Sequence, residues 1–203
     1  MIQNRKNFLR SNKKILAQFD ENTIRVYQAY NHKIANEAVK LGTFGTHFKM
    51  DRMTWIKPSF LWMMYRSGWA TKEGQERILA IDIKRTGFDY ILENVVLSSF
   101  NSEIYGRYEK WRELLEKSEV RCQWDPDRDI YGNALDRRAI QLGIKGEMVN
   151  KYVNDWIVKI TDITDIVIEL REKIRAKTFK ESMLPIEDEY PLNERLKKTL
   201  GII

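Results

Sequence analysis

The chain has 203 residues, of which 43% are hydrophobic and 32% are charged, and this balance excludes an intrinsically disordered protein. No uncharged run approaches the roughly 20 residues that a membrane-spanning helix requires, and the lone cysteine, Cys122, excludes an internal disulfide. Because the first residues also lack the apolar stretch of a signal peptide, we expect a cytoplasmic protein with no membrane partner.

The net charge of +6 is concentrated near the start of the chain. Residues 1–19 hold five basic side chains and no acidic one, which leaves 30 bases against 29 acids in the remainder. A basic arm of this kind either stays solvated or is attracted to phosphates. We therefore expect a basic arm over residues 1–21, a single domain over 22–177 and a tail over 178–203 that docks on the domain.

Hydrophobic periodicity predicts that strands and helices alternate along the domain. Asn31 and Gly42 are a favourable N-cap and C-terminal stop for a helix between them. In chain order, the patterns predict a helix over 8–19, a strand over 24–30, a helix over 32–41, an extended segment over 52–57, a helix over 60–66, a strand over 76–84, helices over 88–97 and 105–117, a strand over 120–124, a turn over 125–129, a strand over 138–144, a helix over 148–156, a strand over 157–161 and a helix over 165–177. These elements predict an α+β fold, in which a mixed, short-stranded sheet packs with a central buried helix and several outer helices.

The stretch from Arg52 to Trp69 is unusual because it holds three of the six tryptophans and three of the seven methionines. Residues 60–66 are apolar around most of a helix, which predicts burial. Trp62, Arg66 and Trp69 would share one face of that helix, and rings that flank a guanidinium can hold a flat anionic ligand. The alternative is that the helix serves the core alone. The ligand-binding residues predicted in this stretch are Arg52, Trp55, Lys57, Arg66 and Trp69.

A second group of polar residues lies between 123 and 129. Three aspartates spaced two apart resemble the start of a calcium loop, but Ile130 and Asp136 occupy the positions that require glycine and glutamate. The segment is either a structural turn or the mouth of a pocket, and the latter makes Trp124, Asp125 and Arg128 ligand-binding residues. The two histidines lack ligand spacing, so we expect no metal site, and we expect Cys122 to be buried as a small apolar residue.

Four segments of the sequence carry a family resemblance when they are taken together. They are residues 24–31 (IRVYQAYN), 52–69 (RMTWIKPSFLWMMYRSGW), 123–128 (QWDPDR) and 138–143 (RAIQLG). With this set of motifs, the chain resembles the family called domain of unknown function 4291 over about residues 22–175. The resemblance implies a small, stand-alone, intracellular protein, and it implies no established reaction.

The sequence has no glycine-rich phosphate loop of the Walker or Rossmann kind. An enzyme of this composition would therefore use arginine, tyrosine, glutamine and carboxylates. ADP-ribosyltransferase-like folds are small α+β domains that bind NAD without such a loop, and by this analogy we hypothesise a nucleotide- or NAD-recognising enzyme with NAD as the possible cofactor. The candidate catalytic residues are Arg25, Gln28, Tyr65, Gln141 and Glu147.

Two alternatives belong to other classes of protein. A non-catalytic module for single-stranded nucleic acid would use the basic arm for phosphates and exposed aromatic rings for base stacking. A structural or protein-interaction domain would have no pocket, and it predicts that all six tryptophans are buried.

Overall fold

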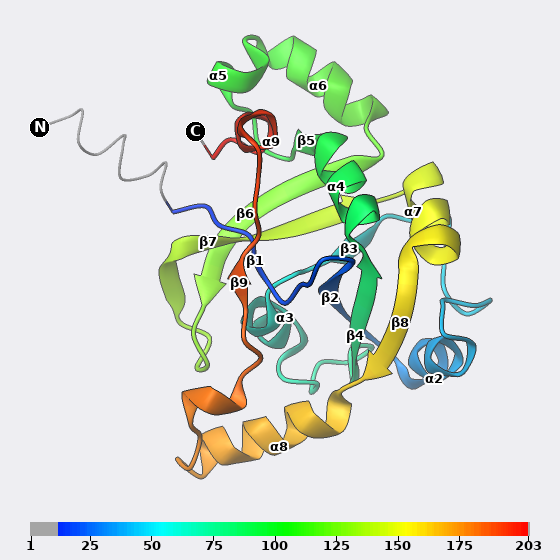
Figure 1. The fold of residues 1–203 in the computed structure, drawn as a ribbon, viewed down its shortest axis with the longest axis vertical. Coiled ribbons are helices and arrows are strands. Elements are labelled where there is room, and N and C mark those ends of the chain that lie inside the picture. The colour runs from blue at the N-terminus through cyan, green and yellow to red at the C-terminus, as the bar shows by residue number, and fades with distance from the viewer. Residues whose placement is uncertain (1–11, 203) are drawn as a thin grey trace, which may run out of the picture.

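The computed structural model describes residues 12–202, which form one α+β domain (Figure 1). The predicted fold class is therefore confirmed, with strands in two main sheets, a central helix between them and further helices around the outside. Within residues 12–202, none of the helices combines the length and the apolar character needed to cross a membrane.

The first sheet has three antiparallel strands in the order β2 (Thr23–Tyr30), β4 (Arg77–Lys84) and β8 (Ile157–Asp162). Val26 lies opposite Ile81, and Ile81 lies opposite Ile160. These β-branched side chains are buried in the main hydrophobic core, which explains why short strands pair stably here. The predicted strands over 24–30 and 76–84 are confirmed.

The second sheet has four strands in the order β3 (Thr54–Ile56), β7 (Ala134–Ile144), β6 (Val120–Arg128) and β5 (Val95–Leu97). Only the β5–β6 pair is parallel, so the sheet is mixed as predicted. β6 runs on to Arg128 through the segment predicted as a turn, and the chain reverses beyond it around Asp129. The Asp129 carboxylate accepts the backbone N–H of Tyr131 and Asn133. Cys122 is 2% exposed in β6, in agreement with its expected burial.

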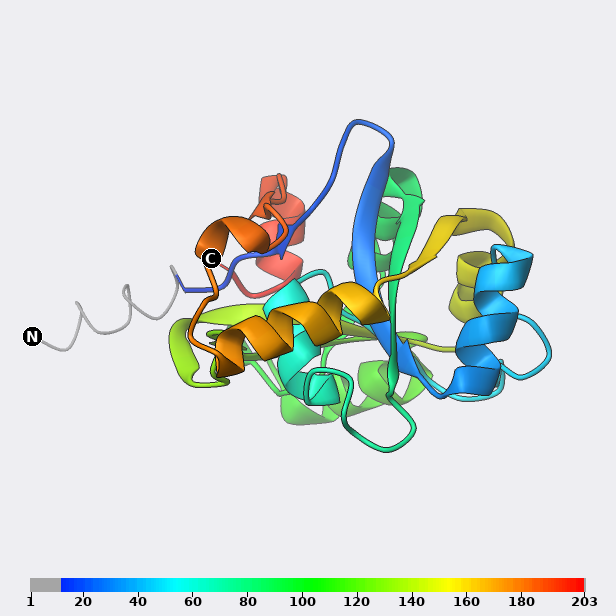
Figure 2. The same ribbon diagram turned by 90° about the horizontal axis from the view of Figure 1, so that it is seen from below.

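The two sheets meet where the end of β3 lies against β2. Tyr27 N–H donates to the Lys57 carbonyl at 2.7 Å, and Lys57 N–H donates to the Tyr27 carbonyl at 3.3 Å. The two sheets are steeply inclined to each other (Figure 2). Because the pairing stops after one residue pair, the sheets diverge from this junction and leave room for side chains between them.

Helix α3 (Phe60–Ser67) is the central helix that the sequence predicts. Phe60 and Met63 are each 2% exposed, and Met64 is completely buried. The helix ends at Gly68, whose φ of 59° is the left-handed conformation that glycine adopts without strain. Trp69 therefore lies beyond the helix, and the predicted face of Trp62, Arg66 and Trp69 is wrong for Trp69.

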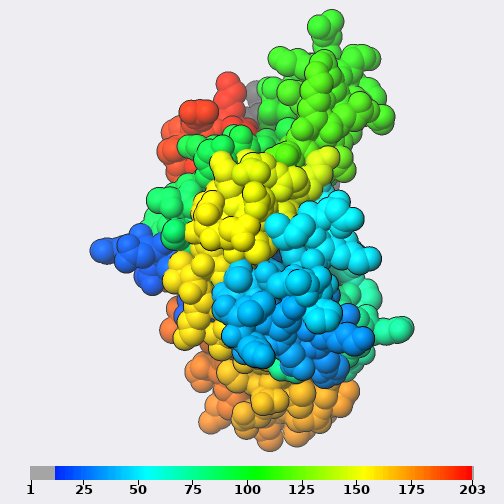
Figure 3. All heavy atoms as spheres, turned by 90° about the vertical axis from the view of Figure 1, so that its right-hand side faces the viewer, coloured from blue at the N-terminus to red at the C-terminus, as the bar shows by residue number. Residues whose placement is uncertain are grey.

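Helix α2 (His32–Leu41) follows β2 as predicted. Its N-cap is Asn31, which accepts the Ile34 N–H at 3.0 Å, and Gly42 ends it in the left-handed conformation. The connection from α2 to β3 covers one side of the molecule next to the segment from α7 to β8 (Figure 3). There the Thr43 hydroxyl donates to the Val153 carbonyl at 2.5 Å.

The remaining helices lie around the sheets, with α6 and α8 at opposite ends of the molecule in Figure 1. The predicted helix over 88–97 is wrong at its end, because the chain leaves the helix at Asn94 and enters β5. The outer helices are α4 (Arg85–Glu93), α5 (Ser102–Tyr105), α6 (Tyr108–Lys117), α7 (Glu147–Lys151), which continues as the π-turn η1 (Tyr152–Trp156), α8 (Thr164–Arg175), the 3₁₀ turn η2 (Glu181–Met183) and α9 (Glu194–Thr199).

The start and the end of the described chain lie side by side. Strand β1 (Leu16–Ala17) pairs with β9 (Asp188–Glu189), and Ile15 and Ala17 are buried. The predicted helix over 8–19 is therefore wrong for its described part, while residues 8–11 lie outside the described residues. From the C-terminal segment, Tyr190 is 2% exposed and packs into the main core.

Candidate functional site

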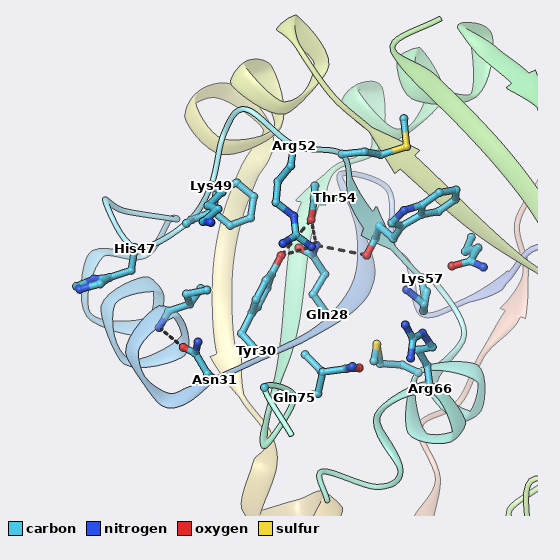
Figure 4. Close-up of a pocket in the computed structure, with 18 of the residues that line it drawn as sticks. Gln28, Tyr30, Asn31, His47, Lys49, Arg52, Thr54, Lys57, Arg66 and Gln75 are labelled. Atoms are coloured by element: carbon cyan, nitrogen blue, oxygen red, sulfur yellow. Dashed lines mark hydrogen bonds between the residues drawn. The ribbon is translucent and has the colours of Figure 1, made fainter. Parts of the chain in front are cut away.

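A cleft of about 730 Å³ opens between the diverging sheets (Figure 4). Strand β2 and the start of α2 form one side of it, the segment leading into β3 and the β3 residues form another, and α3 and the β6–β7 strands complete it. Pockets of about 300–1,000 Å³ are typical of small-molecule sites. The cleft therefore has the size of a small-molecule site. It lies beside the junction between Tyr27 and Lys57, from which the two sheets diverge.

A hydrogen-bonded cluster of polar side chains lies under the cleft. Gln28, which is 3% exposed, donates to the hydroxyl oxygens of Tyr30 and Thr54, each at 2.8 Å. Its carbonyl oxygen accepts the Tyr152 hydroxyl at 2.8 Å. Because every polar atom of the Gln28 amide is thereby bonded, the cluster is rigid, and burial is tolerated without an unpaired polar group.

The charged residues that line the cleft are all basic. They are Lys33, Lys49, Arg52, Lys57, Arg66 and the ionisable His47, and none of the lining residues in the described part of the chain is Asp or Glu. His47 Nδ1 lies 3.0 Å from Glu37, outside the lining. The five lysines and arginines have no hydrogen-bonded or ion-paired side-chain partner within residues 12–202.

Some arginines elsewhere in the fold are held in ion pairs, in contrast to those of the cleft. Arg25 holds Asp82 through two hydrogen bonds of 2.8 and 2.9 Å, and Arg137 holds the buried Asp127 at 2.6 Å. A group of unpaired cations on concave walls raises the local positive potential and attracts anions. The cleft is therefore suited to an anionic ligand.

Lys57 is the most unusual of these cations because it is only 5% exposed. Burial, and after it the positive charge of Arg66, lower the pKa of the Lys57 ammonium to about 8, while Asp125 opposes the shift. Figure 4 shows the side chains of Lys57 and Arg66 next to each other, with Arg52 over the polar cluster. An anion between Lys57 and Arg66 would relieve the repulsion of the two cations.

Aromatic rings form the apolar part of the lining. Trp55 is half-buried in β3, and Phe48 is stacked on Phe44 at a centroid distance of 4.3 Å. Trp55 lies opposite Gly143 across the β3–β7 pair. A Cβ atom at Gly143 would lie 2.9 Å from the Trp55 ring and 2.7 Å from the Met53 sulfur. The absence of a side chain at Gly143 therefore allows the Trp55 ring to lie across β7.

Gly143→Ala is expected to displace the Trp55 ring, to lower the free energy of unfolding by about 1–3 kcal/mol through overpacking, and to weaken ligand binding in the cleft. Gly87→Ala is a matched control, since its Cβ would lie 2.4 Å from Trp156, which does not line the cleft. Chemical denaturation and tryptophan emission measure both variants. Equal loss of binding in both would contradict the role given to Gly143.

A second hydrogen-bonded group lies at the β6–β7 side of the cleft. The Gln141 amide donates to the Gln123 oxygen at 3.0 Å and to the Asp125 carboxylate at 2.7 Å. Gln123 and Gln141 line the cleft, whereas Asp125 does not and instead lines a separate pocket that Gln123 also borders. The Asp125 carboxylate is therefore already hydrogen-bonded to a lining residue.

The structure brings together part of the predicted set of site residues. Those that line the cleft are Arg52, Trp55, Lys57, Arg66, Gln28 and Gln141. Asp125 contacts Gln141 from outside.

The other predicted ligand-binding residues point elsewhere. Trp69 packs edge-on against Phe60, with ring centroids 6.1 Å apart. The Trp124 indole N–H donates to the Leu200 carbonyl at 2.9 Å. The Arg128 guanidinium lies 4.1 Å from the centre of the Tyr65 ring.

Three of the candidate catalytic residues also lie outside the cleft. Arg25 is held by Asp82 on the opposite face of β2 from Gln28. Tyr65 is stacked on Trp62 and covered by Arg128. Glu147 is exposed at the start of α7 and accepts from Asn150.

Several residues at the cleft were not predicted from the sequence. Tyr30 shares the Gln28 face of β2, and the alternation of that strand was the signal that could have found it. Thr54 joins the cluster from β3, and the buried Tyr152, which does not line the cleft, joins it from η1. Lys33 lies in the first turn of α2, and Lys49 lies in the connection from α2 to β3. For these four the sequence carries no comparable signal.

The family model described as Domain of unknown function (DUF4291) matches residues 14–190 of the chain. The match includes β1, the cleft and the C-terminal segment up to Tyr190. A search of the curated proteins found no match.

Proposed function

Since the chain belongs to the DUF4291 family, whose description assigns no activity, we propose from the cleft itself that the protein binds a phosphate-bearing nucleotide, with NAD and ADP-ribose as the ligands to test first. The observation that carries the proposal is a lining in which, among residues 12–202, five lysines and arginines are unpaired and no carboxylate is present.

The arrangement of charges and rings supports a nucleotide over a simple inorganic anion. Arg52 and the Lys57–Arg66 pair lie apart within the cleft (Figure 4), so two anionic groups of one ligand can be held at once. The half-buried Trp55 supplies aromatic surface on which a base or a nicotinamide ring can stack, and Phe48, at 7% exposed, adds only a small apolar area. The volume of about 730 Å³ is sufficient for a ligand larger than a single phosphate.

The chemistry of the lining supports recognition more directly than a transfer reaction. Gln28 and Gln141 are the two catalytic candidates in the cleft, and amides neither gain nor lose protons at neutral pH. The Gln28 amide is fully hydrogen-bonded within its cluster and holds Tyr30 and Thr54 in place, whereas the Gln141 carbonyl oxygen can accept a hydrogen bond from a ribose or an amide. Transfer of ADP-ribose from the bound ligand, by analogy with ADP-ribosyltransferases, stays a hypothesis.

The competing hypotheses have less support in the described residues. The basic arm that a nucleic-acid module would use lies mostly in residues 1–11, outside the described part of the chain. A structural domain predicts six buried tryptophans, but only Trp62 and Trp111 are in that class, at 6% and 7% exposed. The other four are half-buried.

Titration calorimetry with NAD and with ADP-ribose tests the proposal. We expect saturable binding of at least one of them, with quenching of tryptophan emission and an affinity that falls as salt is raised, because the contacts are ionic. If both ligands at millimolar concentration gave no heat and no quenching, the proposal would be overturned.

A further inference from the structure

Lys57 is more buried and more rigidly held than the attraction of an anion to the cleft would require. Its backbone is fixed by the two hydrogen bonds with Tyr27 and by the following Pro58, so its side chain starts from a rigid position. The side chain is 5% exposed, lines the cleft and has no hydrogen-bonded or ion-paired partner within the described residues. An exposed lysine would attract an anion equally well without the cost of burial.

Burial next to another cation favours the neutral form of an amine, which is the nucleophilic form. The charged groups that act on Lys57 are Arg66, which disfavours its protonation, and Asp125, which favours it. With a pKa of about 8, roughly one Lys57 amine in ten is neutral at pH 7, against about one in three thousand for a lysine at the ordinary value. Lys57 therefore combines a fixed position, access to the cleft and a supply of neutral amine.

We propose that Lys57 is a nucleophilic amine that forms an imine with the aldehyde of a phosphorylated sugar held in the cleft. The inference rests on the proposed function, because Arg52 and Arg66, which would hold the phosphates of a nucleotide, would also hold the phosphate of this ligand while Lys57 reacts. It adds to that function a covalent step and a ligand class, the phosphorylated reducing sugars.

The step balances without any co-reactant. The Lys57 nitrogen attacks the carbonyl carbon, a C–N bond forms, and the carbonyl oxygen takes up a proton to give a carbinolamine. The nitrogen gives up one proton to solvent as the carbinolamine forms, the hydroxyl takes up a proton from solvent, and the nitrogen lone pair expels it as water and leaves a protonated imine. The sum is one neutral amine, one aldehyde and one solvent proton converted into one protonated imine and one water, with no change in oxidation state.

The cleft selects among aldehydes by charge. Arg66 lies next to Lys57, and Arg52 lies across the polar cluster (Figure 4), so a phosphate can be bound while the sugar carbon faces the amine. Ribose 5-phosphate and ADP-ribose both have a C1 that opens to an aldehyde. NAD has the same phosphates, but its C1 atoms are held in glycosidic bonds, so it can bind without reacting.

Reductive trapping tests the inference on the full chain. The protein is incubated at pH 7 with ribose 5-phosphate, with ADP-ribose or with unphosphorylated ribose, borohydride then reduces any imine to a stable secondary amine, and peptide mass spectrometry locates the adduct. We expect the adduct at Lys57, formed at least about 10-fold faster than at the exposed Lys33 and Lys49, faster with the phosphorylated sugars than with ribose, and suppressed by NAD.

Variants and binding measurements separate this inference from the proposed function. Lys57→Arg and Lys57→Met are both expected to lose the adduct, although Lys57→Arg keeps a cation in the cleft. If either variant fails to fold, the position of the adduct in the unchanged protein, located by peptide mass spectrometry, still tests the proposal. Adducts spread evenly over Lys33, Lys49 and Lys57, or absent from Lys57 while NAD binds, would overturn the imine and leave the nucleotide proposal standing. Absence of all binding would overturn both.

Discussion

Replacing Arg52 and Arg66 together with glutamine is expected to weaken the binding of ADP-ribose by at least about 100-fold, because each charge-assisted hydrogen bond contributes about 1.5–3 kcal/mol. Both side chains are exposed in the cleft and lack partners within residues 12–202, so their removal leaves no buried acid unpaired. The free energy of unfolding should therefore change little. Titration calorimetry gives the affinity, and chemical denaturation checks the fold.

The matched control carries the same change in net charge on α6. Arg112→Gln with Lys117→Gln removes two exposed cations, each of which has an acidic neighbour one turn away. We expect this variant to bind ADP-ribose within about 2-fold of the unchanged protein, since solvent screens charges at that distance. A similar loss in both double variants would mean that total charge, and not the cleft, governs binding.

Tyr190→Ala is expected to lower the free energy of unfolding by about 3–5 kcal/mol, the range for removing a large buried ring. The ring packs edge-on against Phe19 and Phe88, at centroid distances of 5.1 and 5.2 Å. Its hydroxyl donates to Asp89 at 2.7 Å and accepts from Arg85 at 3.2 Å. Tyr190→Phe keeps the ring and is expected to cost about 1 kcal/mol. Urea denaturation measures both.

Ile186→Ala provides the comparison for Tyr190 within the same segment. Ile186 is 81% exposed, so its truncation is expected to change the free energy of unfolding by less than about 0.5 kcal/mol. If the two alanine variants were equally stable, the C-terminal segment would not be part of the cooperative fold. The predicted docking of residues 178–203 would then be refuted.

Local signals explain which elements could be predicted from the sequence. Asn31 and Gly42 mark the ends of α2, and Pro58 and Gly68 enclose α3, because capping and backbone restriction act within a few residues. The segment before residue 19 is misread from the sequence because apolar residues recur at helical spacing along 8–19, whereas its buried positions, Ile15 and Ala17, are two apart as in a strand. Its true partner, β9, is far away in the sequence.

The short range of sequence signals also explains which residues of the site could be predicted. Arg52, Lys57 and Arg66 were found because they are the charged ends of an otherwise apolar stretch. Trp69 was misplaced because the left-handed Gly68 turns the chain away after α3. The polar cluster around Gln28 requires the meeting of two sheets and a tyrosine that is 124 residues away. No short sequence pattern encodes that meeting.

The pairing of β1 with β9 has a consequence for the synthesis of the chain. Lys14 contacts Glu189 across 175 positions, and the Ile15 carbonyl accepts the Tyr190 N–H. On a translating ribosome, β1 emerges early and its pairing edge stays open until almost all of the domain has been made. Contacts of such long range also form slowly in a free chain. Completion of this fold is thus tied to the synthesis of β9, and a chain that terminates before β9 exposes the β1 edge to aggregation.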